Sequence, residues 1–274
     1  MDVSDLSHLH LAVLGPGNMG GALIRGWVKA GTLAAENIRF YTPNAAKAAA
    51  LSDATGAISA ATASEAVIGA DAVLVSVKPH LVLFSLASVY DVLPPGCPVI
   101  SVAAGVKLDA IERILPDKTP VLRVMPNTPV QVGEGASAFC RGKSANDHHA
   151  FLVQKLFSAI GCAVEVITES QIDAVIGVAG SASAYFYLII EALTDGGVRA
   201  GLPRPTARLL AAQTALGSAK MILETGEHTA VLKDAVTTPG GTTIAALHVL
   251  EKAGIRGALI DAVLAAQQRA QEMS

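Results

Sequence analysis

The chain has 274 residues, of which 51% are hydrophobic, 16% charged and 4% aromatic, and its formal net charge is −3. It carries 20 basic and 23 acidic residues without a run of Lys or Arg, which excludes the electrostatic surface that a nucleic-acid-binding protein needs. Asp71, Glu191 and Asp195 keep the most apolar stretches below the ~18 consecutive residues of a membrane span, so we expect neither nucleic acid nor a membrane as a partner.

The first residues, MDVSDLSHLH, are acidic and lack the charged-then-apolar build of a signal peptide, which predicts a cytoplasmic protein. Cys97, Cys140 and Cys162 are widely spaced and form no CxxC pair. We therefore expect buried, reduced thiols rather than a disulfide framework or a zinc site.

Residues 9 to 166 alternate short apolar runs with helix-length segments, such as 18–31 and 44–51, which end at turn glycines. The earlier apolar runs are continuous rather than alternating, as is typical of parallel strands that helices cover on both faces. This pattern predicts an α/β fold with a Rossmann-type, doubly wound, mostly parallel sheet in residues 1–167. The predicted strands are 9–14, 38–41, 71–77, 97–103, 120–125, 137–140 and 162–167.

After residue 168 the strand signal stops, and residues 168–274 are predicted to form an all-helical domain. Its helices should break at 201–205, 225–228, 237–241 and 253–257. The segment 180–193 is apolar nearly all round, and a single helical layer would cover it poorly. We therefore expect these helices to form the interface of a homodimer.

The first predicted strand runs directly into Gly15-Pro16-Gly17-Asn18-Met19-Gly20, and a helical pattern follows at once. In this context the first glycine makes the tight turn, the second lets a diphosphate approach the backbone, and the third lets the helix pack on the strand. The free N–H groups and the dipole of the helix start favour the anion. The motif predicts dinucleotide binding by Gly15, Gly17, Asn18, Met19 and Gly20.

An Asp or Glu that would hold the ribose hydroxyls of NAD is missing after the second strand, where the sequence reads Tyr41-Thr42-Pro43-Asn44. Thr42, Asn44 and Lys47 can instead hold a 2′-phosphate, although Lys47 is equally compatible with a solvated helix position. This favours NADP, with NADPH preferred and NAD possible.

Loops at the carboxyl ends of parallel strands bind ligands in such sheets. Two of them, 77–80 and 102–106, are predicted to flank the nicotinamide half of the cofactor. Lys78 and His80 could act as acid/base groups or, as we favour, in closing their loop. The prolines around Asn127 should fix its amide for positioning rather than for proton transfer. The candidate cofactor-binding residues of these loops are Val77, Lys78, Pro79, Ala103, Ala104, Gly105 and Asn127.

The block 232–251, LKDAVTTPGGTTIAALHVLE, predicts a second helix start that can hold an anion. Thr237 and Thr238 can cap the helix, and Pro239 suits its first turn. The site is too small for a diphosphate and rich in hydroxyls, so a substrate carboxylate is the expected occupant, with an ordinary capped helix start as the alternative.

GPGNMG, VKPH, SVAAGV, MPNTPV, EGA and above all the 232–251 block resemble the pyrroline-5-carboxylate reductase family over nearly the whole chain. The resemblance implies reduction of 1-pyrroline-5-carboxylate to L-proline, the last step of proline biosynthesis. It also implies a homodimer through the C-terminal helices, assembled into a larger ring such as a decamer. By position, Thr238, Gly241 and Thr242 would bind the substrate carboxylate, and Thr243 would lie next to the ring nitrogen.

Many members of this family carry Asn two residues before Glu65, where it helps to hold the adenosine ribose or its phosphate; this chain has Ala63. A protonated cyclic imine is already electrophilic, so its reduction needs no metal and no strong acid. Positioning then supplies most of the rate. We expect no metal site among the seven histidines, and we assign Thr243 to orient the imine nitrogen.

Two other interpretations compete. A β-hydroxyacid dehydrogenase would need a catalytic Lys on the first long helix of the second domain, and residues 180–191 contain none. A sensor that binds dinucleotide without turnover would not need the Thr-rich second anion site.

Overall fold

The computed structural model describes residues 6–273 and divides the chain into two compact units. Of the described residues, the sheet unit comprises 6–181 together with 265–273, and the helical unit comprises Ala182–Leu264. The sheet unit thus extends beyond residue 167, where the sequence placed the domain boundary. The reason is an ion-pair cluster: Arg123, buried in the sheet, pairs with Glu169 at 3.0 Å and with Asp173 at 3.4 Å and holds the next helix against the sheet.

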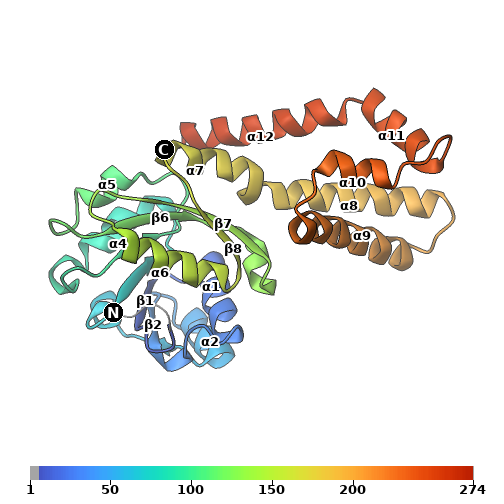
Figure 1. Ribbon diagram of the computed structural model, residues 1–274. Helices are drawn as coiled ribbons and strands as arrows, with labels where there is room; N and C mark the ends of the chain where they lie inside the picture. The colour runs from blue at the N-terminus through green and yellow to red at the C-terminus, as the bar shows by residue number, and fades with distance from the viewer. Residues whose placement is uncertain (1–5, 274) are drawn as a thin grey trace. The chain divides into compact units, whose positions relative to one another are not determined.

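The sheet unit contains one eight-stranded sheet of order β3-β2-β1-β4-β5-β6-β7-β8 (Figure 1). All neighbouring strands are parallel except β6 and β7, which confirms the predicted mostly parallel, doubly wound sheet. Seven strands overlap the predicted ranges, and β3 is additional. The strands are β1 (Leu11–Leu14), β2 (Ile38–Tyr41), β3 (Ile58–Ser59), β4 (Ala72–Val75), β5 (Val99–Ser101), β6 (Val121–Met125), β7 (Gly135–Arg141) and β8 (Gly161–Glu165).

Two hydrophobic cores lie on opposite faces of this sheet. Successive residues of β1 alternate between them: Leu11 and Val13 belong to one core, Ala12 and Leu14 to the other. Helices therefore cover both faces, which explains the continuous apolar runs. The α-helices of the sheet unit are α1 (Asn18–Lys29), α2 (Ala45–Thr55), α3 (Ala63–Val67), α4 (Val82–Ala87), α5 (Leu108–Glu112), α6 (Asp147–Ser158) and α7 (Glu169–Val175).

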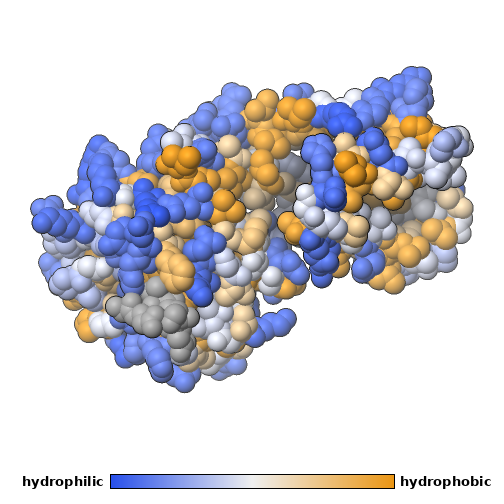
Figure 2. Space-filling model, in the orientation of Figure 1, coloured by the Kyte–Doolittle hydropathy of each residue, from blue (hydrophilic) through white to orange (hydrophobic). Residues whose placement is uncertain are grey.

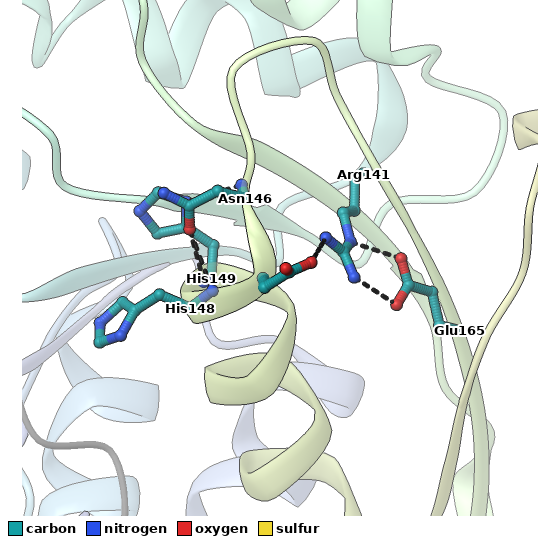
Figure 3. A network of polar contacts seen from close by, with 6 residues as sticks. Arg141, Asn146, His148, His149 and Glu165 are labelled. Atoms are coloured by element: carbon teal, nitrogen blue, oxygen red, sulfur yellow. Dashed lines mark hydrogen bonds and ion pairs between the residues drawn. The ribbon is translucent and has the colours of Figure 1, made fainter.

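A polar network fixes the start of α6 against β7 and β8 (Figure 3). Arg141 donates to Glu165 through Nη2 at 2.8 Å. The hydrogen bonds of Arg141 to Glu165 and to Asp147 raise the pKa of the guanidinium. The Asn146 side chain accepts from the backbone N–H groups of His148 and His149, and Nδ1 of His149 accepts from the backbone of Asn146 at 3.1 Å. The paired histidines thus serve a helix cap.

The helical unit is built from α8 (Ala182–Arg199), α9 (Arg204–Thr225), α10 (Thr229–Ala235), α11 (Thr242–Lys252) and most of α12 (Ile255–Glu272). Every break between these helices falls at a predicted position. The buried residues of α8 and α9 are small, namely Ala182, Thr194, Ala207 and Ala211. Large apolar side chains are instead exposed, as Figure 2 shows over these helices; among them are Phe186, Leu188, Leu209, Leu223, Val249 and Ile260. This surface needs a partner.

One continuous helical stretch, Glu169–Arg199, is long and apolar enough to cross a membrane, with a mean hydropathy of 1.5 and 22% of its window buried. No such stretch was predicted, because Glu191 and Asp195 interrupt the apolar run. Length and composition alone are weak evidence, because a helix that is covered at a subunit interface passes the same test.

Cys97 and Cys140 are buried, as expected, whereas Cys162 on β8 is exposed, so the expectation for this third thiol is wrong. Burial raises the pKa of Cys97 and of Cys140 to about 12, and the charges of Asp71 and Glu169 add to the respective shifts.

These pKa values predict that a single thiol per chain reacts rapidly with 5,5′-dithiobis(2-nitrobenzoate) at pH 8. At that pH the two buried thiols are almost entirely protonated, and the thiolate is the reactive form. Their reactivity should rise only as the pH approaches 12 or the chain unfolds. A second rapidly reacting thiol in the native protein would contradict the prediction.

Candidate active site

The turn after β1 requires glycine at position 15. Gly15 has φ +68°, and its N–H donates to the carbonyl of Tyr41 at the end of β2 at 2.8 Å. A Cβ atom on Gly15 would overlap Cγ1 of Val77, which follows β4. The turn therefore brings together the carboxyl ends of β1, β2 and β4, where open α/β sheets bind their ligands.

The other two glycines of the motif lie in different surroundings. Gly17 precedes α1 as its N-cap, and in the described chain no side chain caps this helix. The nearest atom to a Cβ on Gly17 would be 4.0 Å away, so the backbone is open to an approaching anion. A Cβ on Gly20 would lie 2.6 Å from Oγ of Ser76, so here glycine permits close packing of α1 on the sheet. Asn18 and Met19, the first residues of α1, complete the predicted diphosphate site.

A cavity of about 460 Å³ begins at this turn. Its walls come from the ends of β1 and β2, the segment after β4, the start of α3 and the length of α4. Gly15 and Val77 are the predicted cofactor-binding residues that line it. The other lining residues are Leu14, Tyr41, Pro43, Thr62, Ala63, Ser64, Leu81, Phe84, Ser85 and Ser88.

The residues predicted to hold a 2′-phosphate, Thr42, Asn44 and Lys47, do not line this cavity but lie beside it, after β2. Asn44 caps α2: its Oδ1 accepts from the backbone N–H of Lys47 at 2.9 Å. This leaves its amide N–H groups for a ligand. Ala63, the position at which this chain lacks the Asn of many members of the family that it resembles, lies in the cavity wall itself.

Val77 lines the same cavity as Tyr41 and Pro43. The next two residues, Lys78 and Pro79, lead into a short 3-10 helix, and the carbonyl of Lys78 accepts from Leu81 N–H at 2.9 Å. This geometry favours the loop-closing alternative for Lys78.

The loops after β5 and β6 also lie at the carboxyl edge of the sheet. Ala103 is buried, Ala104 is half-buried, and Gly105 has φ +75°. Asn127 is 8% exposed; its Oδ1 accepts from Ala136 N–H at 2.9 Å, and its Nδ2 donates to the carbonyl of Ala179 at 3.3 Å. The side chain is fixed, but it binds protein backbone through one of its two N–H donors and one of the two lone pairs of its oxygen.

The second predicted site is the start of α11. Gly241 is its N-cap, and within residues 6–273 no side chain caps this helix, so its first N–H groups are available to an anion. Thr242 and Thr243 are its first two residues. Gly240 has φ +68°, and a Cβ on Gly241 would overlap Oγ1 of Thr238.

The expected capping at this site is wrong in two respects. The hydroxyl of Thr237 donates to the carbonyl of Lys233 at 2.7 Å and so closes the end of α10. Pro239 lies in the turn before α11 and not in its first turn. Because neither threonine caps the helix, its start stays open. A cavity of about 590 Å³ beside it is lined by Gly240, Gly241, Lys233 and the exposed His248, among others.

Among the described residues, no group of three or more His, Cys, Asp or Glu side chains could hold a metal ion. The arrangement instead offers two helix starts, one in each unit, that can bind anions. A Rossmann-type unit with an open diphosphate turn, joined to a helical unit with a second anion site, defines a dinucleotide-dependent oxidoreductase.

Comparison with known proteins identifies the family. A family model described as pyrroline-5-carboxylate reductase dimerisation matches residues 169–273, and one described as NADP oxidoreductase, coenzyme F420-dependent, matches residues 10–105. The pyrroline-5-carboxylate reductase of Escherichia coli K12 is 40% identical over 264 residues, which cover 96% of this chain and 98% of that protein. The pyrroline-5-carboxylate reductase of Synechocystis sp. is 43% identical over 268 residues, which cover 97% of this chain and 98% of that protein.

Solved structures indicate the same family. The pyrroline-5-carboxylate reductase of Coxiella burnetii is 33% identical with a TM-score of 0.92, covering 97% of this chain and 99% of that one. The Plasmodium falciparum pyrroline carboxylate reductase, solved with NADP bound, is 30% identical with a TM-score of 0.87, covering 98% and 99%. The chain belongs to the pyrroline-5-carboxylate reductase family.

Proposed function

We propose that this chain reduces 1-pyrroline-5-carboxylate to L-proline with NADPH as the preferred reductant. The observation that carries this proposal is the uncapped start of α11, in a family member that also has an open diphosphate turn. Full-length similarity to named reductases supports it.

The residues of the sheet unit fit a dinucleotide. The backbone N–H groups of Asn18 and Met19 would hold the diphosphate. The N–H of Gly17 donates to the carbonyl of Gly15 at 2.7 Å, so Gly17 would contribute by letting the diphosphate approach the backbone. Ala103, Ala104 and Gly105 would line the path of the nicotinamide half. When bound, the cofactor supplies a hydride.

The residues of the helical unit fit a small ring acid. The hydroxyl of Thr238 and the N–H group of Thr242 would bind the carboxylate. The N–H of Gly241 donates to the carbonyl of Thr238 at 3.0 Å, so Gly241 would hold the turn that presents these two groups. Oγ1 of Thr243 would accept a hydrogen bond from the protonated ring nitrogen and so orient the imine carbon. Hydride addition to that carbon turns the C=N π electrons into the amine lone pair, so the substrate proton suffices and no further acid is required. Holding two reactants in place contributes up to about 7–11 kcal/mol in model reactions.

The direct test is to add 1-pyrroline-5-carboxylate to the purified protein with NADPH and to follow both NADPH absorbance and proline. We expect equal amounts of NADPH consumed and proline formed. A protein that binds NADPH but produces no proline would be a sensor. A protein that forms no proline but reduces the keto form of a hydroxy acid would be a dehydrogenase. Either result overturns the proposal.

We expect NADPH to be used at least about tenfold more efficiently than NADH, which corresponds to one hydrogen bond to a charged group at about 1.5–3 kcal/mol. The segment after β2 carries no carboxylate that would repel the 2′-phosphate, and Thr42, Asn44 and Lys47 would surround that group. The ratio of kcat/KM values measures the preference. Lys47→Ala should lower the ratio, and a clear preference of the unaltered protein for NADH would contradict the assignment.

We further propose a homodimer through the helical unit, assembled into a ring such as a decamer, in the cytoplasm and without nucleic acid or membrane partners. The exposed apolar side chains of α8, α9 and α11 and the dimerisation model over residues 169–273 support the dimer.

Light scattering at micromolar concentration should therefore give a dimer or a multiple of it. Leu188→Glu, at a position that is 66% exposed in the single chain, should shift the protein toward monomer. A stable monomer of the unaltered protein would contradict the interface. After cell lysis and ultracentrifugation we expect the protein in the supernatant; recovery in the membrane pellet would instead assign Glu169–Arg199 to a bilayer.

A further inference from the structure

The side chain of Phe84 on α4 is 75% exposed, although it is one of only six phenylalanines in the chain. Single exposed apolar residues are ordinary on protein surfaces. Phe84 differs because it lies on the wall of the cavity that begins at Gly15, at the carboxyl end of the sheet. Its exposed ring is thus available to whatever enters that cavity.

The chemistry of the cavity narrows the choice of ligand group. Its lining within the described chain contains no charged residue, and much of it is apolar, including Tyr41, Pro43, Val77 and Leu81. A phosphate would find no cation there, whereas a flat, uncharged ring would find apolar walls and a few hydroxyls. The cavity also starts at the turn that the dinucleotide's diphosphate would occupy, so the group that enters it must be attached close to a diphosphate.

We propose that the ring of Phe84 stacks on the adenine base of the dinucleotide and is a determinant of cofactor affinity. This inference rests on the proposed function. In this arrangement two parts of the protein bind the adenosine half. The uncharged cavity holds the base, and Thr42, Asn44 and Lys47, which lie outside the cavity, hold the 2′-phosphate. Stacking on an aromatic side chain is an established way to bind a base without reading its hydrogen-bonding edge.

The test uses 2′,5′-ADP, which carries the adenine and the 2′-phosphate but no nicotinamide, so binding is measured by titration calorimetry without turnover. Phe84→Ala should weaken binding about 5- to 20-fold, the lower part of the range for the loss of one base–aromatic stack. Phe84→Tyr keeps the aromatic face and should bind like the unaltered protein. Leu83→Ala is the matched control, because Leu83 is an apolar, 39% exposed neighbour on α4 that does not line the cavity.

In turnover, Phe84→Ala should raise the KM for NADPH by a similar factor and leave kcat and the KM for the imine within about twofold. Equal affinity of Phe84→Ala and the unaltered protein for 2′,5′-ADP would overturn the inference while leaving the proposed function intact. A change of oligomeric state in Phe84→Ala, seen by light scattering, would also overturn it, because the ring would then belong to an interface. Failure of the unaltered protein to bind 2′,5′-ADP at all would instead contradict the proposed dinucleotide site.

Discussion

Gly15→Ala is expected to weaken NADPH binding by more than about tenfold and to lower the thermal midpoint by about 5 °C or more. An L-residue at φ +68° costs about 1–2 kcal/mol, and overpacking against Val77 costs about 1–3 kcal/mol. At this size each kcal/mol lowers the midpoint by about 2–4 °C. The relief of this overlap must move either the diphosphate turn or the loop after β4, and both border the cavity.

Gly31→Ala is the matched control for this variant. Gly31 has φ +67°, nearly the same as Gly15, but a Cβ atom there would meet nothing within 4 Å. It should therefore show the conformational cost alone, about 1–2 kcal/mol, with unchanged affinity for NADPH. Differential scanning fluorimetry and a fluorescence titration measure the two effects. Equal loss of affinity in both variants would show that the turn at Gly15 has no specific part in cofactor binding.

Thr243→Ala is expected to lower kcat/KM for 1-pyrroline-5-carboxylate by roughly 10- to 100-fold. This corresponds to the loss of one hydrogen bond to a charged group, about 1.5–3 kcal/mol. Thr243 is in the first turn of α11 and does not cap it, so stability should change little. The KM for NADPH should also remain unchanged, because the residue belongs to the substrate site.

Two further variants make the Thr243 experiment decisive. Thr243→Ser retains a hydroxyl and should recover most of the lost efficiency. Thr229→Ala changes the first residue of a different helix, α10, and should behave like the unaltered protein. If Thr243→Ala were as efficient as the unaltered protein, its hydroxyl would not contact the reacting end of the substrate.

Much of the fold could be predicted because its signals are local. Continuous apolar runs marked the long strands, and glycine and proline marked each break between helices of the C-terminal third. Strand β3 escaped prediction because its two residues, Ile58 and Ser59, are both exposed and form no apolar run. The antiparallel pairing of β7 with β6 depends on the path of the chain between them, which periodicity does not encode.

The candidate site was predictable to a similar degree. The roles of Gly15 and Gly20 followed from a motif whose spacing reflects backbone geometry. The hydrogen bonds of Asn127 did not, because its partners, Ala136 and Ala179, contribute backbone groups that carry no sequence signal. Phe84 was missed for a related reason: an exposed aromatic residue has meaning only once the cavity beside it is known.

Transfer of deuterium from NADPH to proline tests the central claim most directly, which is that a hydride passes straight from the nicotinamide to an imine held at the start of α11. With NADPH that carries deuterium at both C4 positions, in ordinary water, mass spectrometry of the product should find one deuterium per proline, located at C5. The same label should appear, more slowly, with Thr243→Ala. Proline without deuterium, or label at another carbon, would contradict direct hydride transfer from NADPH to the imine.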